Sequence, residues 1–114
     1  MNTGLLSFPN NLGAQDLYNT IRPPSVLLNN VVTQATPNNH YIFVNNSLTT
    51  SLVLPFNPIP GSVLWVTNVS TLFTHFCNRN GQRINGLAED LFMDLDYRVT
   101  ILRWIDSETG WIVI

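Results

Sequence analysis

Charged residues are scarce in this sequence, and lysine is missing altogether. Only 11% of the residues are charged, against 45% that are hydrophobic, and all five basic residues are arginines. The surface of an ordinary monomeric domain carries roughly 25–35% charged residues. The shortage therefore predicts either an unusually neutral surface or a surface that other protein chains largely cover.

The composition also excludes several classes of function. A net charge of −2 provides no basic stripe for phosphates, so nucleic acid is not expected as a partner. Cys77 is the only cysteine, which rules out an internal disulfide, and we interpret it as a small buried hydrophobe. No run approaches the roughly 18 apolar residues that cross a bilayer, and residues 1–10 lack the features of a signal peptide. We expect no membrane partner.

The 114 residues are predicted to form one domain preceded by an arm. Residues 1–37 are rich in Asn, Pro and Gly without sustained alternation, and we interpret them as an N-terminal anchoring arm. Residues 14–21 have the spacing of one or two helical turns that end before Pro23 and Pro24. Residues 25–33 are either one strand or a small hairpin. The arm packs either on a neighbouring chain or on its own domain.

Residues 38–114 are predicted to be the β-rich domain. Short apolar runs alternate there with Asn, Gly and Pro turn signals, which is typical of an all-β protein. The expected fold is a small antiparallel β-sandwich or barrel-like domain. The predicted strands are residues 40–44, 48–54, 62–68, 72–77, 91–95, 98–105 and 110–114.

Two of these strands are apolar on both faces. Large apolar side chains alternate through residues 98–105 without leaving a polar face, and every residue from Trp111 to Ile114 is apolar. Strands of this kind need cover on both sides, and little helix is expected to supply it. We therefore predict a homo-oligomer, with an interface formed by Trp104, Trp111, Ile112 and Ile114.

The stretch from Asn78 to Leu91 combines turn residues with charges. It contains two Asn-Gly dipeptides, which readily adopt positive φ and predict two tight turns in succession. Two arginines and an acidic pair flank these turns, so a charge-assisted contact between an arginine and a carboxylate is expected to fix the loop. The predicted structural turn comprises Arg79, Asn80, Gly81, Arg83, Asn85, Gly86, Glu89 and Asp90.

Two other groups of residues invite a chemical interpretation. Asp94 and Asp96 would share one strand face, where carboxylates can bind Ca²⁺ or cleave glycosides, but a solvated face explains them more simply. His75 and Cys77 have the spacing of one strand face, yet no third orienting group is visible. We predict no catalytic residue, no metal site and no cofactor.

Several blocks occur together in an order that resembles a known module. They are residues 54–61, 78–81, 84–86, 88–91, 99–101 and 110–113. In this order they resemble a C-terminal β-rich module of bacteriophage tail fibres and other virion appendages, over roughly residues 52–114. Ser62 stands where that module usually has Asp. The resemblance implies a trimeric β structure on the particle surface, and it brings no catalytic residues.

The sequence thus leads to one main hypothesis about function. We expect a non-enzymatic phage structural protein, made in the host cytoplasm, that forms a trimeric fibre, decoration or adaptor on the virion. Its expected partners are copies of itself and, through the arm, another virion protein. One alternative is a tail fibre tip that binds a host surface glycan. Another is a small glycan depolymerase that uses Glu89, Asp94 or Asp96.

Overall fold

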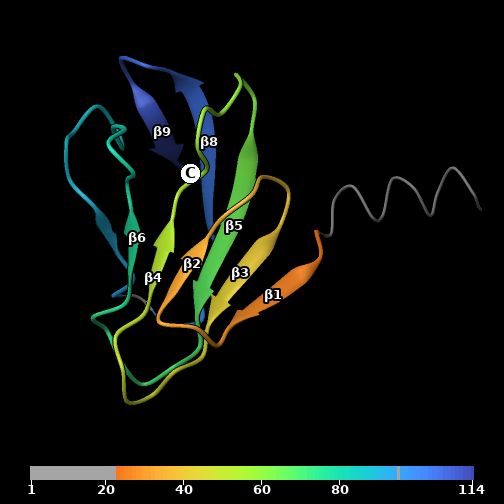
Figure 1. The fold of residues 1–114 in the computed structure, drawn as a ribbon, viewed down its shortest axis with the longest axis vertical. Helices are drawn as coiled ribbons and strands as arrows, with labels where there is room; N and C mark the ends of the chain where they lie inside the picture. Colours follow the sequence, from red (N-terminus) through yellow and green to blue (C-terminus); the bar gives the residue numbers. More distant parts are fainter. Residues whose placement is uncertain (1–22, 95) are drawn as a thin grey trace, which may run out of the picture.

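The computed structural model describes residues 23–94 and 96–114, and every regular element in them is a strand. Turn-forming Asn, Gly and Pro residues separate short runs of β-branched and aromatic residues, which explains why the strands are short. The strands are β1 (Ser25–Leu28), β2 (Val32–Gln34), β3 (His40–Phe43), β4 (Ser51–Val53), β5 (Val63–Asn68), β6 (Phe76–Asn78), β7 (Leu91–Phe92), β8 (Thr100–Asp106) and β9 (Gly110–Val113) (Figure 1).

The first six strands alternate between two sheets. Sheet A has the strand order β1-β3-β5-β8-β9, and sheet B has the order β2-β4-β6-β7. Within sheet A, β1 pairs in parallel with β3 and β3 with β5, while β2, β4 and β6 pair in the same way in sheet B. The chain therefore winds as a short solenoid in which each coil contributes one strand to each sheet (Figure 1).

The last three strands pair with their neighbours in the opposite direction. β7 pairs with β6, β8 with β5 and β9 with β8, and all three pairs are antiparallel. The all-β prediction is confirmed, but the expected antiparallel arrangement is wrong for the four pairs within the solenoid. Apolar alternation identifies a strand and its buried face, but it does not specify the direction of the neighbouring strand.

The side chains that face inward from the two sheets form one buried cluster. Leu28, Tyr41 and Phe43 come from the first strands of sheet A, while Leu52 and Cys77 come from sheet B. Burying one such leucine completely contributes roughly 1.5–3 kcal/mol relative to leaving it in water. The other members of the cluster are Ala35, Leu54, Leu64, Val66, Ile84, Met93, Leu102, Trp104 and Trp111.

Part of the predicted arm belongs to this folded structure. β1 joins sheet A and β2 joins sheet B, and Leu28 and Ala35 lie in the core. The predicted boundary at residue 37 is corrected accordingly, because residues 25–35 bury apolar side chains with the rest of the domain. Residues 25–33 also form neither one strand nor a hairpin, since β1 and β2 lie in different sheets. The helical turn predicted for residues 14–21 lies outside the described residues.

Candidate functional site

The first turn of the Asn78–Leu91 stretch spans residues 79–82. The φ angles of Asn80 and Gly81 are 54° and 75°, and the Gln82 amide donates to the Arg79 carbonyl at 2.9 Å. Two successive residues with positive φ define a type I′ turn, which Asn-Gly favours because Gly has no Cβ and Asn tolerates the left-handed region. The dipeptide therefore sets the shape of this turn locally.

The second turn spans residues 84–87 and has the same type. The φ angles of Asn85 and Gly86 are 52° and 77°. Ile84 and Leu87 exchange two hydrogen bonds, each 2.9 Å long, so this turn forms a minimal hairpin. Only Arg83 lies between the first turn and the second. The chain thus reverses twice within a few residues.

Side chains from this double turn bind the connection that follows β4. The Asn80 Nδ2 atom donates to the Leu54 carbonyl at 3.1 Å, and the Gln82 Nε2 atom donates to the Pro55 carbonyl at 3.0 Å. The Gln82 Oε1 atom accepts from the Trp111 indole N–H at 2.8 Å. One glutamine therefore links the β4–β5 connection to β9.

The backbone of the double turn also pairs with β9. The Trp111 amide donates to the Arg83 carbonyl at 2.8 Å, and the Asn85 amide donates to the Trp111 carbonyl at 2.7 Å. The Asn85 Oδ1 atom accepts from the Val113 amide at 3.0 Å. These contacts use the polar groups of the turn within the chain, and they attach the double turn to the last strand of sheet A.

Gly110 allows this close approach, although sequence reasoning did not single it out. Its φ is 80°, and a Cβ atom built on it would lie 1.8 Å from the Arg83 carbonyl oxygen. Gly81 and Gly86 have nothing within 4 Å of the corresponding position. A side chain at position 110 would therefore collide with the backbone of the double turn. Its location at the start of the predicted strand 110–114 was the available signal.

The charged residues of this stretch make contacts other than those expected. The Asp90 Oδ1 atom accepts from the backbone amide of Arg79 at 2.9 Å, and the Arg79 Nη1 atom donates to the Gln82 carbonyl at 2.9 Å. Arg83 and Glu89 are exposed. In place of the predicted arginine–carboxylate clamp, Arg79 and Asp90 each bind a main-chain group. Main-chain groups are available here because turn residues leave them without strand partners.

Cys77 lies on β6 and His75 directly precedes that strand, and both side chains are fully buried. The His75 Nδ1 atom accepts from the Thr50 amide at 2.9 Å, Nε2 lies 2.8 Å from the Asn45 carbonyl, and the ring stacks on Phe43. This geometry assigns the proton to Nε2, where it is donated to Asn45. Burial, assisted by the negative charge of Asp90, raises the pKa of the Cys77 thiol to about 12. A protonated thiol without solvent access is not a nucleophile.

Asp94 and Asp96 do not form the paired site that one continuous strand would provide. β7 ends at Phe92, and both aspartates are exposed. Among the described residues, no group of three or more His, Cys, Asp or Glu side chains is arranged to hold a metal ion. The expected shared strand face is therefore corrected, because the strand is only two residues long.

Two of the predicted interface residues lie inside the chain. Trp111 is completely buried, Trp104 is 8% exposed, and their rings meet edge to face at 5.5 Å. They fill the core and are not available to a partner, which corrects the interface prediction for both. Ile112 is half-buried and Ile114 is 64% exposed on the other side of the same strand.

Asn68 is a structural residue that the sequence did not reveal. It has no exposed surface, and its Nδ2 atom donates to the carbonyls of Leu72 and Met93 at 2.8 and 2.9 Å. Its Oδ1 atom accepts from the amide and the hydroxyl of Ser70. All four hydrogen-bonding positions of the amide are satisfied, so this side chain holds the β5–β6 connection against the segment after β7.

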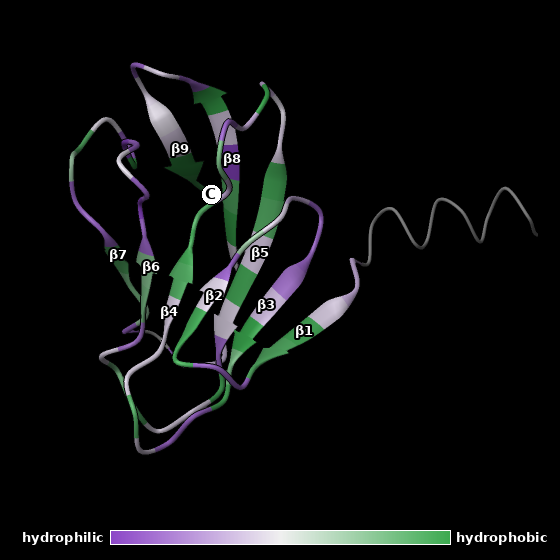
Figure 2. Ribbon diagram, viewed as in Figure 1, coloured by the Kyte–Doolittle hydropathy of each residue, from purple (hydrophilic) through white to green (hydrophobic). Residues whose placement is uncertain are grey.

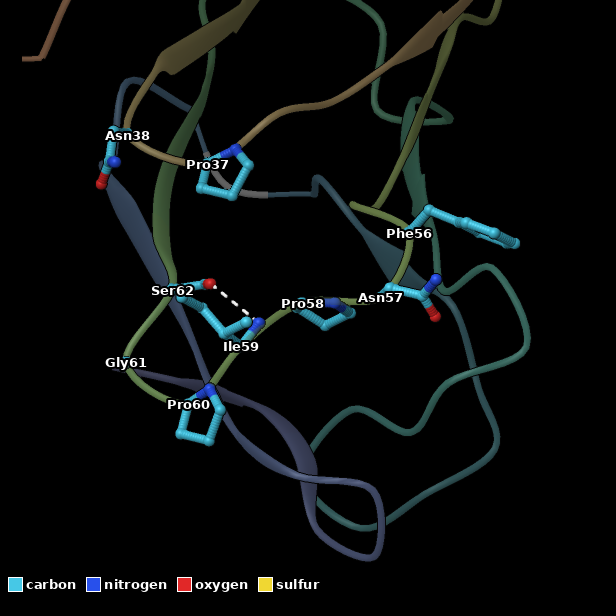
Figure 3. A pocket seen from close by; sticks show the side chains of 9 residues that line it. All are labelled: Pro37, Asn38, Phe56, Asn57, Pro58, Ile59, Pro60, Gly61 and Ser62. Atoms are coloured by element: carbon cyan, nitrogen blue, oxygen red, sulfur yellow. Dashed lines mark hydrogen bonds between the residues drawn. The ribbon is translucent and has the colours of Figure 1, made fainter.

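The Pro-rich connection between β4 and β5 borders an open hollow of about 510 Å³. Residues 56–62 curve around it and Pro37 and Asn38 face it from the β2–β3 connection, while the Phe56 ring points away (Figure 3). A hydrogen bond of 3.2 Å from the Ile59 amide to the Ser62 hydroxyl tightens the loop. The lining holds no ionisable side chain, so the hollow suits an uncharged ligand at most and offers no acid–base chemistry.

Comparisons with known proteins complete the description of the site. No protein-family model matches the sequence, and no curated protein matches it significantly. Among solved structures, a chain in "Structure of a chaperone-substrate complex" is similar, with a TM-score of 0.54 and 15% sequence identity. The match covers 75% of this chain and 14% of that chain. Within the described residues, no helix is long and apolar enough to cross a membrane. At this identity, the structural likeness shows that this β fold also occurs as a small part of a much longer chain.

Proposed function

We propose that this chain is a non-enzymatic structural component of a bacteriophage virion, an oligomeric fibre, decoration or adaptor protein. The observation that carries the proposal is the role of the double turn at residues 78–91, the most distinctive motif of the sequence. Its polar groups form hydrogen bonds with the β4–β5 connection and with β9. Residues 78–81, 84–86 and 88–91 of this motif also belong to the blocks that resemble virion appendages. A motif that is used in this way defines a fold and not a ligand site.

The first coil of the solenoid supports attachment through the N-terminal side. β1 and β2 are the outer strands of sheets A and B, so each presents one unpaired edge within the described residues. Leu27, Val31 and Val32 are more than half exposed on this coil. Unpaired strand edges without charged side chains accept further strands. We propose that another virion protein binds at this end, next to the predicted arm.

The composition of purified particles tests the proposed function. Phage particles purified on a density gradient are analysed by quantitative mass spectrometry, with capsid and tail proteins as internal standards. We expect this protein in a fixed ratio to those standards after high-salt washing. Its absence from the particles, with recovery only in the soluble lysate, would contradict a structural role.

The hollow beside the Pro-rich connection favours one second candidate, a tip protein that binds an uncharged host glycan. Its lining of proline rings and Asn amides lacks charge, and Ile59 is 71% exposed there. Receptor binding requires that the purified protein label host cells and compete with phage adsorption. A variant with Ile59→Asp would lose both activities while staying folded, and Leu48→Asp in a distant exposed loop serves as its control.

A further inference from the structure

Both Asn-Gly dipeptides of the double turn lie where water can reach them. Gly81 and Asn85 are exposed, and Asn80 and Gly86 are half-buried. Much of the connection between β6 and β7 is purple in Figure 2, the colour of hydrophilic residues. The chemical stability of each dipeptide therefore depends on the contacts that hold it, and these contacts differ between the two turns.

An asparagine that precedes a glycine can react with its own backbone. The glycine nitrogen gives its proton to hydroxide and attacks Cγ of the asparagine side chain, and the side-chain nitrogen takes a proton from water and leaves as ammonia. Water then opens the resulting succinimide ring at one of its two carbonyls, which produces aspartate or isoaspartate. Glycine favours the attack because it has no Cβ beside the nitrogen. The reaction needs a glycine N–H that can ionise and an asparagine that can rotate.

The second dipeptide is fixed against the hairpin of β8 and β9. The Gly86 amide donates to the Thr109 carbonyl at 2.8 Å, and the Asn85 amide donates to the Trp111 carbonyl at 2.7 Å. The Asn85 Oδ1 atom accepts from the Val113 amide at 3.0 Å. The attacking nitrogen, the asparagine backbone and the asparagine side chain are thus each held by a hydrogen bond. This part of the fold must open before the dipeptide can react.

In the part of the chain that the structure describes, the first dipeptide lacks this restraint on its glycine nitrogen. No acceptor among those residues binds the Gly81 amide. The Asn80 amide makes only a local contact, to the Asn78 Oδ1 atom at 2.8 Å, and the Asn80 Nδ2 atom donates to the distant Leu54 carbonyl at 3.1 Å. These contacts hold the group that leaves and keep the attacking nitrogen accessible.

We propose that Asn80 is a site of spontaneous deamidation in the folded protein, and that the fold protects Asn85. This inference goes beyond the proposed function and does not depend on it. The new carboxylate has no N–H to donate, so it sets a negative oxygen against the Leu54 carbonyl. The isoaspartate form also adds a backbone carbon to the turn between Arg79 and Gln82. Conversion therefore releases the first turn from the β4–β5 connection, while the second turn stays on β9.

Peptide mapping of the aged protein tests the assignment of the site. Trypsin cleaves after Arg79, Arg83 and Arg98, so Asn80 and Asn85 fall on separate peptides, residues 80–83 and 84–98. The full chain is incubated at pH 8 for several weeks, folded or unfolded in guanidinium chloride. Liquid chromatography with mass spectrometry then quantifies the amide, aspartate and isoaspartate forms of each peptide.

For each asparagine, the rate in the folded chain is divided by the rate in the unfolded chain. We expect this ratio to be at least about tenfold larger for Asn80 than for Asn85, because three ordinary hydrogen bonds make the reactive conformation of Asn85 at least that much rarer. Equal ratios, a larger ratio for Asn85, or a folded chain in which Asn80 stays intact while the unfolded chain converts would overturn the assignment.

The variant Asn80→Asp tests the consequence for the turn. Asn57→Asp is the matched control, because Asn57 is an exposed loop residue that also has a positive φ, of 48°. Loss of one hydrogen bond of ordinary strength should raise the unfolding equilibrium constant of Asn80→Asp by about 2–13-fold relative to the control. Urea unfolding at pH 8 measures both constants. Equal constants would contradict the release of the turn.

Discussion

Replacing Gly110 by alanine is the sharpest test of the contact between the double turn and β9. The new Cβ atom would lie 1.8 Å from the Arg83 carbonyl oxygen, whereas real Cβ contacts almost never fall below 3.0 Å. The two backbones must therefore separate by about 1 Å. That shift breaks the 2.8 Å hydrogen bond from the Trp111 amide to the Arg83 carbonyl, and Trp111 is completely buried.

The cost follows from two terms. A non-glycine residue in the left-handed region costs about 1–2 kcal/mol, and a buried amide without its partner costs about 1–3 kcal/mol more. We expect Gly110→Ala to lower the free energy of unfolding by about 2–5 kcal/mol in total. Gly81→Ala and Gly86→Ala are the controls, because their φ angles are similar but no atom lies within 4 Å. These two variants should lose only the stability that a non-glycine residue in the left-handed region costs, about 1–2 kcal/mol.

Urea and thermal unfolding, followed by circular dichroism, measure the difference between these variants. For a domain of this size, an extra loss of about 1–3 kcal/mol lowers the Tm by roughly 5–20 °C more than in the controls. Equal losses for the three variants would refute the reasoning, because the close approach at Gly110 would then contribute nothing. A Gly110→Ala protein too unstable to purify, beside two stable controls, agrees with it.

Three further predictions follow from the described contacts. The Cys77 thiol, whose pKa burial raises to about 12, should not react with a disulfide reagent at pH 8 until urea unfolds the chain; rapid reaction of the folded protein would contradict this. Hydrogen bonds from Thr109 and Glu108 lower the pKa of Asp106 from 3.8, so the unfolded chain binds that proton more readily and stability falls as the pH drops below about 4. Asp106→Asn keeps an acceptor but should lose this part of the pH dependence, and an unchanged urea midpoint profile would count against it. Asn68→Ala should cost about 2–4 kcal/mol, because it leaves the Met93 carbonyl and the Ser70 amide unpaired, whereas Asn46→Ala at an exposed loop should cost less than half as much in the same urea titration.

The sequence located most strands but misjudged some of their lengths. The predictions for residues 62–68 and 110–114 agree with β5 and β9 to within one residue at each end. The predicted strand 48–54 shortens to Ser51–Val53. The Asn45 side chain accepts from the amides of Ser47 and Leu48, and that local turn delays the strand. A side chain that binds its own backbone competes with strand pairing, and apolar alternation does not record the competition.

The sequence pattern could not predict which strands pair or in which direction. Apolar alternation shows that one side of a strand is buried, but a parallel and an antiparallel neighbour bury it equally well. For the same reason the alternation in β8 separates Trp104 from Ile105 without indicating which of them faces the core. Packing of both sheets decides that question, and it places Trp104 against Trp111 inside the chain.

The candidate site was predictable to the extent that its geometry is local. The Asn-Gly dipeptides at residues 80–81 and 85–86 contain enough information to set their positive φ angles. The contacts that explain the role of the double turn are long-range, since Gln82 reaches both Pro55 and Trp111. Such contacts depend on how the coils stack, which a single sequence does not display.

The mass of the full chain in solution tests the central claim most directly, because the proposed function requires an assembled protein. One chain has a mass of 12.9 kDa, and the trimer implied by the resemblance to virion appendages has three times that mass, 38.7 kDa. Native mass spectrometry and sedimentation equilibrium should both give this value at micromolar concentration. A stable, folded protein of 12.9 kDa that does not associate as its concentration rises would contradict the account.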